Sequence, residues 1–342
     1  MKFLLYLSQN YSFEIMRPLS NLMLEQGHDV RWFVEGSEVN KSHFQSEDVV
    51  LPTISEVIIF KPDACFLPGN VAPSFIPGLK VQLFHGFEWK KKGHFKIREC
   101  FDLYCTQGPF FTKKFNELRN VHPHFTVKET GWTKLDELFK THSSKREKDS
   151  VPTILYAPTF SPSFSSADAL FLQMSELSKK RAWKWKVKFH PKMNKNSINT
   201  FKQAQHEHFE VVEAPSIIPL LQQADVMVSD TSSAITEFLL LGKPVVTFNN
   251  AQPEPVLINI DNANKLENAV EKALEMDEML ANSIKSYGQN MHPYTDGLSA
   301  KRVLEATIDE INNYPRKENV AKPKNWFRNL KLRKRLGYWA LK

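Results

Sequence analysis

The residue types best suited to chemistry come directly after short apolar runs. The densest group is the sequence SDTSS at residues 229–233, between a predicted strand at Val226–Ser229 and a predicted helix at Ala234–Leu241. Hydroxyl groups at the start of a helix can bind a phosphate together with free backbone N–H groups. The same residue types also cap helices without any ligand. Glu237, one turn into the helix, could accept hydrogen bonds from ribose hydroxyls or simply face solvent.

Two histidines also follow predicted strands, one in each half of the chain. His85 and Gly86 come after Lys80–Phe84, and His190 comes after Trp185–Phe189. Histidine suits a general base because its pKa lies near neutrality, and glycine permits a close backbone approach. A lone histidine after a strand is more often structural than catalytic, so both interpretations stay open. One such histidine in each half favours a shared site.

Other patterns exclude several classes of protein. The two His-x-His pairs at residues 122–124 and 206–208 lack nearby acidic or cysteine partners, so no metal site is predicted. The three cysteines fit neither a disulfide framework nor a usual zinc spacing. The chain has no G-x-G-x-x-G, no P-loop and no G-x-S-x-G. This argues against a dinucleotide oxidoreductase, a P-loop kinase and an α/β-hydrolase.

Alternating strands and helices must position these residues. In the first half we predict strands at Lys2–Leu7, Asp29–Val34, Ala64–Leu67, Lys80–Phe84, Asp102–Thr106 and Phe125–Lys128, and helices at Tyr11–Gln26 and Pro109–Leu118. In the second half we predict strands at Thr153–Tyr156, Trp185–Phe189, Phe209–Val212, Val226–Ser229 and Pro244–Phe248, and helices at Ala167–Lys180, Ile198–Gln205, Ile217–Gln222, Ala234–Leu241, Ala263–Glu275 and Gly297–Asn312. Such alternation is typical of βαβ units and parallel sheets.

The predicted fold is therefore α/β, with two facing Rossmann-like domains and a site between them at the carboxyl ends of the strands. A length of 342 residues also suggests two domains. We place an acceptor domain at 1–141, a polar linker at 142–150, a nucleotide-donor domain at 151–314 and a basic, aromatic tail at 315–342.

The charge is concentrated in that tail. The chain has a net charge of +7, and residues 315–342 hold ten of its 45 Lys and Arg but only one of its 38 acidic residues. The nearly neutral remainder argues against a nucleic-acid binder, whose basic surface would extend over the fold. No run approaches the ~18 apolar residues of a membrane span, and Phe3–Leu7 is too short for a signal peptide. We expect a cytoplasmic protein.

The tail itself has a loosely amphipathic pattern. At 100° per residue, four basic side chains fall on one stripe and the apolar side chains of Trp326, Leu330 and Leu341 fall opposite. The basic stripe consists of Arg328, Lys331, Arg335 and Lys342. Tryptophan and tyrosine favour membrane interfaces, and basic residues favour anionic lipid. We therefore predict peripheral docking on the inner face of the cytoplasmic membrane, with a solvated basic tail as the alternative.

Several short motifs, taken in order, resemble the CDP-glycerol glycerophosphotransferase family. They are His85-Gly86, GWTKLD at residues 131–136, YAPTF at 156–160, His190-Pro191, SDTSS at 229–233, GKP at 242–244 and Asp296-Gly297. The family commonly has His-Gly-Thr-Pro-Leu-Lys where this chain has HGFEWK. The resemblance implies a GT-B architecture, with His85 as the base and His190, as a histidinium, holding donor phosphate. It leaves the roles of Asp136 and Asp296 unassigned. The residues expected at the donor are Asp230, Thr231, Ser232, Ser233 and Glu237.

By this resemblance the chain is a transferase of cell-envelope polymer synthesis, as in teichoic acid or capsule. It would move glycerol phosphate, or a related polyol phosphate, from a CDP-activated donor to a hydroxyl of a glycan or lipid-linked acceptor and release CMP. No cofactor is expected. The alternatives are a GT-B glycosyltransferase with a nucleotide-sugar donor and a relative of UDP-sugar epimerases.

Overall fold

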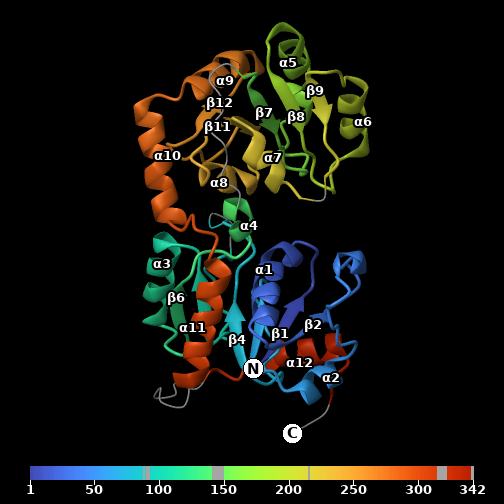
Figure 1. The fold of residues 1–342 in the computed structure, drawn as a ribbon, viewed down its shortest axis with the longest axis vertical. Helices are drawn as coiled ribbons and strands as arrows, with labels where there is room; N and C mark the ends of the chain where they lie inside the picture. The colour runs from blue at the N-terminus through green and yellow to red at the C-terminus, as the bar shows by residue number, and fades with distance from the viewer. Residues whose placement is uncertain (88, 90–92, 141–149, 215, 314–321, 340–342) are drawn as a thin grey trace. The chain divides into compact units, whose positions relative to one another are not determined.

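The chain folds into two units, each built on its own parallel sheet (Figure 1). The computed structural model describes all residues except 88, 90–92, 141–149, 215, 314–321 and 340–342. Unit 1 comprises Met1–Lys140 and Asn290–Lys342, and unit 2 comprises Thr141–Gln289. The predicted division differs at one point, because it placed residues 290–314 with the second half. The predicted linker, 142–150, lies outside the described residues apart from Ser150.

The sheet of unit 1 has six parallel strands in the order β2-β1-β3-β4-β5-β6. They are β1 Lys2–Leu7, β2 Asp29–Val34, β3 Ala64–Leu67, β4 Leu79–Gln82, β5 Leu103–Thr106 and β6 Thr126–Glu129. The chain adds β2 on one side of β1 and then crosses to β3 on the other side. The order therefore reverses between β1 and β3, and such a reversal opens a crevice at the carboxyl ends of the strands.

Helices cover both faces of this sheet (Figure 1). They are α1 Ser12–Glu25, α2 Ile54–Phe60, α3 Pro109–Arg119, α4 Leu135–Lys140, α11 Ser299–Asn313 and α12 Trp326–Leu336, with a short 3₁₀ turn at Lys41–His43. Every residue of β3, β4 and β5 is buried, which explains why β3 and most of β5 read as apolar runs, whereas β4 alternates apolar and polar residues. Lys80 is the charged exception, and its ammonium donates to the carbonyl of Pro77 at 3.4 Å.

Unit 2 repeats the design with the strand order β12-β11-β10-β7-β8-β9. Its strands are β7 Thr153–Tyr156, β8 Lys184–Val187, β9 Phe209–Val211, β10 Val226–Ser229, β11 Val245–Phe248 and β12 Ile258–Ile260. Its helices are α5 Ala167–Lys180, α6 Lys195–Gln203, α7 Ile218–Gln223, α8 Ala234–Leu239, α9 Leu266–Glu275 and most of α10 Glu278–Met291, with a 3₁₀ turn at Ala263–Lys265. Here the order reverses between β7 and β10.

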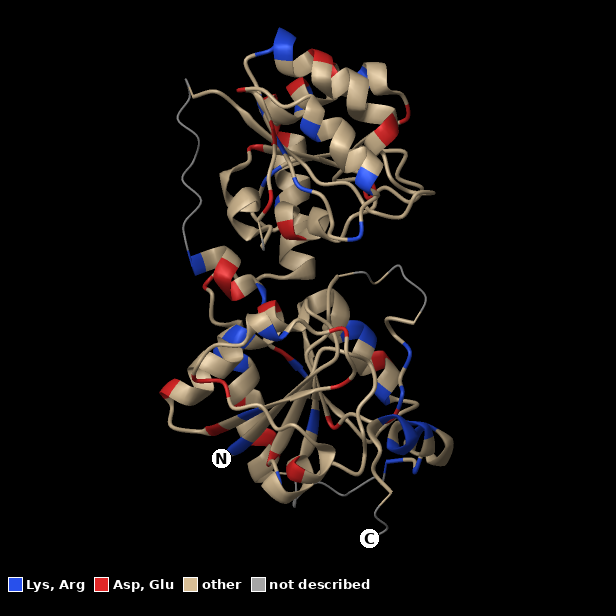
Figure 2. Ribbon diagram, turned by 90° about the vertical axis from the view of Figure 1, so that its right-hand side faces the viewer, with Lys and Arg blue, Asp and Glu red and all other residues tan. Residues whose placement is uncertain are grey.

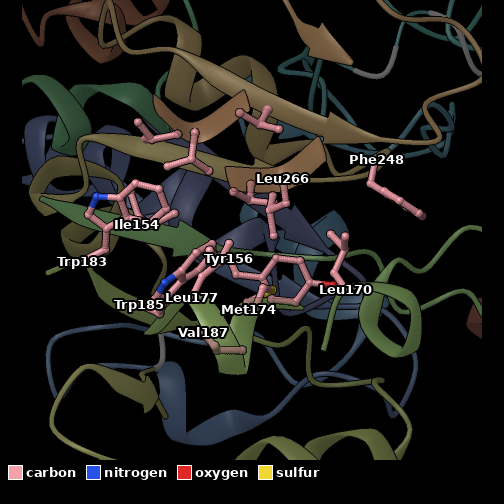
Figure 3. Packing of buried hydrophobic residues seen from close by; sticks show 14 of the residues in the cluster. Ile154, Tyr156, Leu170, Met174, Leu177, Trp183, Trp185, Val187, Phe248 and Leu266 are labelled. Atoms are coloured by element: carbon pink, nitrogen blue, oxygen red, sulfur yellow. The ribbon is translucent and has the colours of Figure 1, made fainter. Parts of the chain in front are cut away.

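One apolar cluster holds the helices of unit 2 on its sheet. Figure 3 shows side chains of β7 and β8, such as Tyr156 and Trp185, packed with Leu170 and Met174 of α5. Leu266 of α9 belongs to the same cluster and is fully buried. Burying a side chain of this size contributes about 1.5–3 kcal/mol to folding.

The predicted fold class is confirmed as two Rossmann-like α/β units. Every predicted strand and helix is present, with ends that differ by at most a few residues. Four elements lack a predicted counterpart: α2, α4, α10 and β12. The tail forms a helix, α12, and Lys and Arg gather on this segment beside the C-terminus (Figure 2). No described helix combines the length and apolar character needed to cross a bilayer.

Candidate functional site

The hydroxyl-rich turn of residues 229–233 lies at the strand reversal of unit 2. It follows β10, and its neighbour β7 is followed by the loop that contains Thr159 and Phe160. β8 lies on the other side of β7 and is followed by His190. Three of the segments singled out from the sequence therefore share one edge of one sheet. This edge is where doubly wound folds bind their ligands.

Asp230 ties two of these segments together. Its side chain is 1% exposed. Oδ1 accepts hydrogen bonds from the N–H groups of Thr159, at 2.9 Å, and Thr231, at 2.6 Å. Oδ2 accepts from the N–H and the hydroxyl of Ser166, both at 3.0 Å. A carboxylate with four internal donors positions the site, so the structure gives Asp230 a supporting role and not the donor contact expected from the sequence.

One hydroxyl group of the turn caps the following helix, and two others are exposed. Ser232 Oγ accepts from the Ala234 N–H at 3.3 Å, which is the local capping bond that the sequence left as an alternative. Thr231 and Ser233 are exposed, and within the described residues nothing bonds to their hydroxyls. Because α8 has only six residues, its dipole is small, and these hydroxyls are the main groups available to a phosphate.

Glu237 lies in the first turn of α8 and is 3% exposed. The solvent-facing interpretation of this residue is therefore wrong. The carboxyl group of Glu237 is therefore buried three residues after the first residue of α8. Its role toward ribose hydroxyls stays a prediction.

His190 is exposed and rests on an aromatic ring. Its imidazole stacks on Phe160 with ring centroids 4.5 Å apart. Nδ1 accepts from the N–H of Lys192 at 3.1 Å, so in the neutral ring the proton is on Nε2. Partial burial, with Lys192 and Lys188 nearby, lowers the pKa of His190. The structure thus favours a neutral imidazole that donates from Nε2, whereas the sequence analysis expected a histidinium.

His85 stands at the corresponding edge of unit 1, three residues after β4. Phe84, just before it, has φ of +59° while its ring is buried in the core. A left-handed conformation costs an aromatic residue about 1–2 kcal/mol. The left-handed conformation of Phe84 changes the direction of the chain, and the side chain of His85 is exposed. Backbone strain of this kind is concentrated at functional positions.

The contacts of His85 leave one ring nitrogen available. Nδ1 lies 3.4 Å from the carbonyl oxygen of Pro68, which also accepts from Gln82 Nε2 at 3.1 Å. Because a carbonyl only accepts, this contact requires the proton on Nδ1 and leaves the lone pair on Nε2. Gly86 is buried, and its carbonyl accepts from Gln107 Nε2 at 3.1 Å. In the neutral tautomer that the Pro68 contact favours, Nε2 of His85 is the nitrogen that can accept a proton.

A family model described as CDP-Glycerol:Poly(glycerophosphate) glycerophosphotransferase matches residues 90–309, well over half of the chain. The chain belongs to this family. The matched part contains His190 and the hydroxyl turn, while His85 and α12 lie outside it. Among curated proteins no match was found.

Solved structures similar to this glycerophosphotransferase share its fold at low identity. One is a UDP-N-acetylglucosamine 2-epimerase of Listeria monocytogenes, with a TM-score of 0.66, 15% identity and coverage of 94% of this chain and 99% of that one. Another is MnaA of S. aureus with UDP, with a TM-score of 0.64, 15% identity and coverage of 94% and 98%. The wall teichoic acid polymerase TagF has a TM-score of 0.62, 13% identity and coverage of 92% and 90%. The GT-B type of fold is thereby confirmed.

The two remaining acidic residues of the resemblance have structural partners. Asp136, 2% exposed, accepts from the N–H groups of Ser299 and Ala300 at 2.8 and 2.7 Å and so caps α11. Burial raises the pKa of Asp136, although these bonds oppose the shift. Asp296 pairs with Arg302. In the glycerophosphotransferase Asp136 fastens the returning segment, residues 290–313, to the first part of unit 1. Asp296 makes an ion pair within that segment.

A histidine that the sequence analysis did not single out completes this attachment. His292 is 2% exposed, and its Nε2 accepts from the Trp132 N–H at 2.9 Å. Burial lowers the pKa of His292 to about 4. Gly131 has φ of +79°, and a Cβ there would come within 2.5 Å of Ser299 Oγ. The GWTKLD segment therefore packs against the C-terminal segment, residues 290–313, that returns to unit 1.

Neither His-x-His pair forms part of a metal-binding cluster. Within the described residues, no three His, Cys, Asp or Glu side chains group closely enough to hold a metal ion. His122 Nδ1 lies 3.2 Å from Glu99, and His206 Nε2 lies 2.9 Å from Ser178 Oγ. Both histidines thus have ordinary protein partners.

Proposed function

We propose that the enzyme transfers glycerol phosphate from CDP-glycerol to a hydroxyl of a glycan or lipid-linked acceptor and releases CMP. The observation that carries this proposal is the hydroxyl turn beside His190 at the strand reversal of unit 2, in a chain of a CDP-glycerol-dependent family. Unit 2 is then the donor unit, with the diphosphate at Thr231, Ser232 and Ser233. The whole-chain likeness to TagF is consistent with this.

The reaction forms one bond and breaks one. The acceptor oxygen bonds to the phosphorus of the glycerol phosphate group, and the P–O bond to CMP breaks. The acceptor proton passes to Nε2 of His85, whose lone pair the Pro68 contact leaves available. The negative charge on the leaving CMP is met by the hydroxyls of the turn and by the Nε2–H of His190. These residues need no cofactor for that chemistry.

The test is a donor screen with the full chain. CDP-glycerol, CDP-ribitol and UDP-N-acetylglucosamine are offered with a glycerol phosphate oligomer as acceptor, and free CMP and UDP are measured. We expect acceptor-dependent CMP release from CDP-glycerol or its ribitol analogue. Release of UDP alone would refute the proposal.

A sugar-nucleotide enzyme is the second candidate because two of the similar structures are, by their names, a UDP-N-acetylglucosamine 2-epimerase and a complex with UDP. A hydroxyl turn and a buried carboxylate such as Glu237 would suit any nucleoside diphosphate. An epimerase converts the UDP-sugar without an acceptor hydroxyl and without releasing UDP. Incubating UDP-N-acetylglucosamine without acceptor and measuring its epimer therefore separates the two candidates.

We also propose that α12 brings the enzyme to an anionic membrane. Trp326, Phe327, Leu330 and Trp339 are 68%, 85%, 51% and 59% exposed. Aromatic side chains with basic neighbours favour the headgroup region of a bilayer. Sedimentation with phosphatidylglycerol vesicles at low salt should pull down the enzyme, and a Trp326→Ser and Phe327→Ser double variant should sediment less. Leu172→Ser, at another site that is 71% exposed, is the control. Equal sedimentation of all three proteins would refute membrane docking through α12.

A further inference from the structure

A pocket lies wholly within unit 1, at the strand reversal between β1 and β3. It has a volume of about 660 Å³. Three loops line it, after β1 (Ser8 and Gln9), after β2 (Glu35–Glu38) and after β3 (Pro68–Val71). The remaining side is α12, which contributes Arg328, Lys331, Leu332 and Arg335. Three residues of the basic stripe predicted for lipid, Arg328, Lys331 and Arg335, therefore line a pocket of the enzyme. The fourth, Lys342, lies outside the described residues.

The helix is fixed to unit 1, so its cations hold defined positions. Leu332 is 3% exposed. The Arg333 guanidinium lies 4.7 Å from the centre of the Phe75 ring, and Phe75 stacks on Tyr338 at 5.3 Å. Ser74 Oγ donates to Asn329 Oδ1 at 2.7 Å. Packing and hydrogen bonds together make α12 one wall of the pocket.

Among the residues that the structure describes, two of the three cations in this wall have no acidic partner. Arg335 pairs with Glu35, which also accepts from the Tyr6 hydroxyl at 2.8 Å. Arg328 donates only to neutral oxygens, the Arg98 carbonyl and, at 3.4 Å, Asn325 Oδ1. Lys331 has no ion-pair or hydrogen-bond partner among the described residues. The three cations outnumber the two acidic lining residues, Glu35 and Glu38, and this excess of positive charge favours an anionic ligand.

The other lining groups point to a ligand that also carries hydroxyls. The serines at positions 8, 12 and 37 and Asn70 offer neutral donors and acceptors. Glu38 is held by Gln9 Nε2 at 2.7 Å and keeps oxygen lone pairs that can accept from hydroxyls. The cations of this pocket can bind a phosphate, and the neighbouring oxygen acceptors can bind hydroxyl groups. A polyol phosphate carries both kinds of group. Guanidinium and ammonium groups also form the stronger, charge-assisted bonds to phosphate.

The pocket adjoins the candidate base. Pro68 lines the pocket, and its carbonyl is the one that His85 Nδ1 contacts. Tyr11, next to the lining residue Ser12, has its ring 5.8 Å from the His85 ring. One lining residue, Pro68, therefore contacts His85 directly, and Tyr11, the sequence neighbour of another lining residue, contacts its ring.

We propose that this pocket is an acceptor subsite, in which Arg328 and Lys331 bind a phosphodiester of a growing polyol phosphate chain. This rests on the proposed function, because it assigns the acceptor of that same reaction to unit 1. The occupied subsite holds the chain while its terminal hydroxyl meets His85. The phosphodiester that binds there belongs to the polyol phosphate chain of the acceptor and not to a lipid headgroup.

Binding without donor tests the subsite separately from catalysis. The probe is a short glycerol phosphate oligomer, titrated calorimetrically into the full chain without CDP-glycerol. Lys331→Gln should weaken binding about tenfold or more, the usual effect of losing one charge-assisted hydrogen bond. Lys334→Gln, on the same helix but outside the pocket lining, is the matched control and should bind as the wild type does. Thermal denaturation of each variant checks folding, and Lys331 has no internal partner to lose.

Kinetics supply the second measurement. Lys331→Gln should raise the KM for the oligomer about tenfold and leave the KM for CDP-glycerol unchanged. Equal oligomer affinity in the wild type and Lys331→Gln, or equal weakening by Lys334→Gln, would overturn the subsite. Weaker vesicle binding by Lys331→Gln with unchanged oligomer binding would also overturn it, in favour of a lipid headgroup. If the oligomer binds and CDP-glycerol is never turned over, the proposed function fails while the pocket remains a phosphodiester site.

Discussion

Replacing Asp230 by asparagine should destabilise unit 2 without removing any group that touches a substrate. The asparagine oxygen can still accept from the N–H groups of Thr159 and Thr231, as Oδ1 does now. The new NH₂ group would replace Oδ2 and would face the N–H of Ser166, which is 2% exposed. A buried donor left without an acceptor costs about 1–3 kcal/mol, and the remaining bonds lose their charge assistance.

The expected loss is therefore about 3–4 kcal/mol of unfolding free energy. For a domain of this size that corresponds to a fall in Tm of roughly 6–16 °C. Differential scanning calorimetry measures it, with Asp225→Asn as the control. Asp225 accepts one hydrogen bond, from the Thr153 N–H at 2.8 Å, and its asparagine keeps an oxygen for that bond, so the expected loss is under about 1 kcal/mol.

The same substitution should also weaken CDP binding, because Asp230 holds the Thr159 loop against the hydroxyl turn. Calorimetric titration with CDP measures this at a temperature where the variant is folded. A Tm within 2 °C of the wild type would refute the reasoning, since it would mean that the four hydrogen bonds at Asp230 contribute almost nothing. An unchanged affinity for CDP with a large fall in Tm would separate stability from donor binding.

Three further substitutions test other parts of the enzyme. His85→Ala should lower acceptor-dependent CMP release ~10²–10⁴-fold with CDP affinity unchanged, and turnover above a third of the wild type would exclude His85 as the base. Ser232→Ala with Ser233→Ala should weaken CDP binding by ~1–3 kcal/mol in calorimetry; a lower Tm with unchanged affinity would mean that these hydroxyls only cap α8. Because burial lowers the pKa of His292 to about 4, the unfolded chain binds its proton first, so stability should fall by up to about 3 kcal/mol as pH drops from 6.5 toward 4. Urea unfolding across that range should show a shallower fall in His292→Asn, and an identical fall would contradict the assignment.

The sequence predicted the central strands β3, β7, β10 and β11 well because each is a short, nearly continuous apolar run that parallel packing buries on both faces. It did not predict α10, whose fourteen residues include Gly288 and many polar side chains. Nor did it predict that the chain returns to unit 1 after that helix. The return depends on contacts such as those of Asp136 with the N-terminus of α11, which join residues more than 160 positions apart. No local pattern encodes such a contact.

The site shows the same division between local and distant information. The strand-end rule placed His85, His190 and the hydroxyl turn at the carboxyl edges of their sheets, as the structure does. The hydrogen bonds by which Asp230 joins two loops could not be predicted, because its partners Thr159 and Ser166 precede it by more than sixty residues. The tautomer of His190 depends on the Lys192 N–H, a contact that requires the fold of the loop.

The C-terminal helix shows why a helical projection cannot by itself assign a surface to a partner. The projection correctly separated Arg328, Lys331 and Arg335 from Trp326 and Leu330, and on that basis the basic stripe was expected to meet lipid. The pattern of charge fixes which residues share a face, but only the fold decides what that face meets. Here unit 1 meets the basic face, and the aromatic edge remains exposed. The two faces can then act together: the aromatic edge would hold the enzyme at a bilayer while the basic face binds the chain that grows from it.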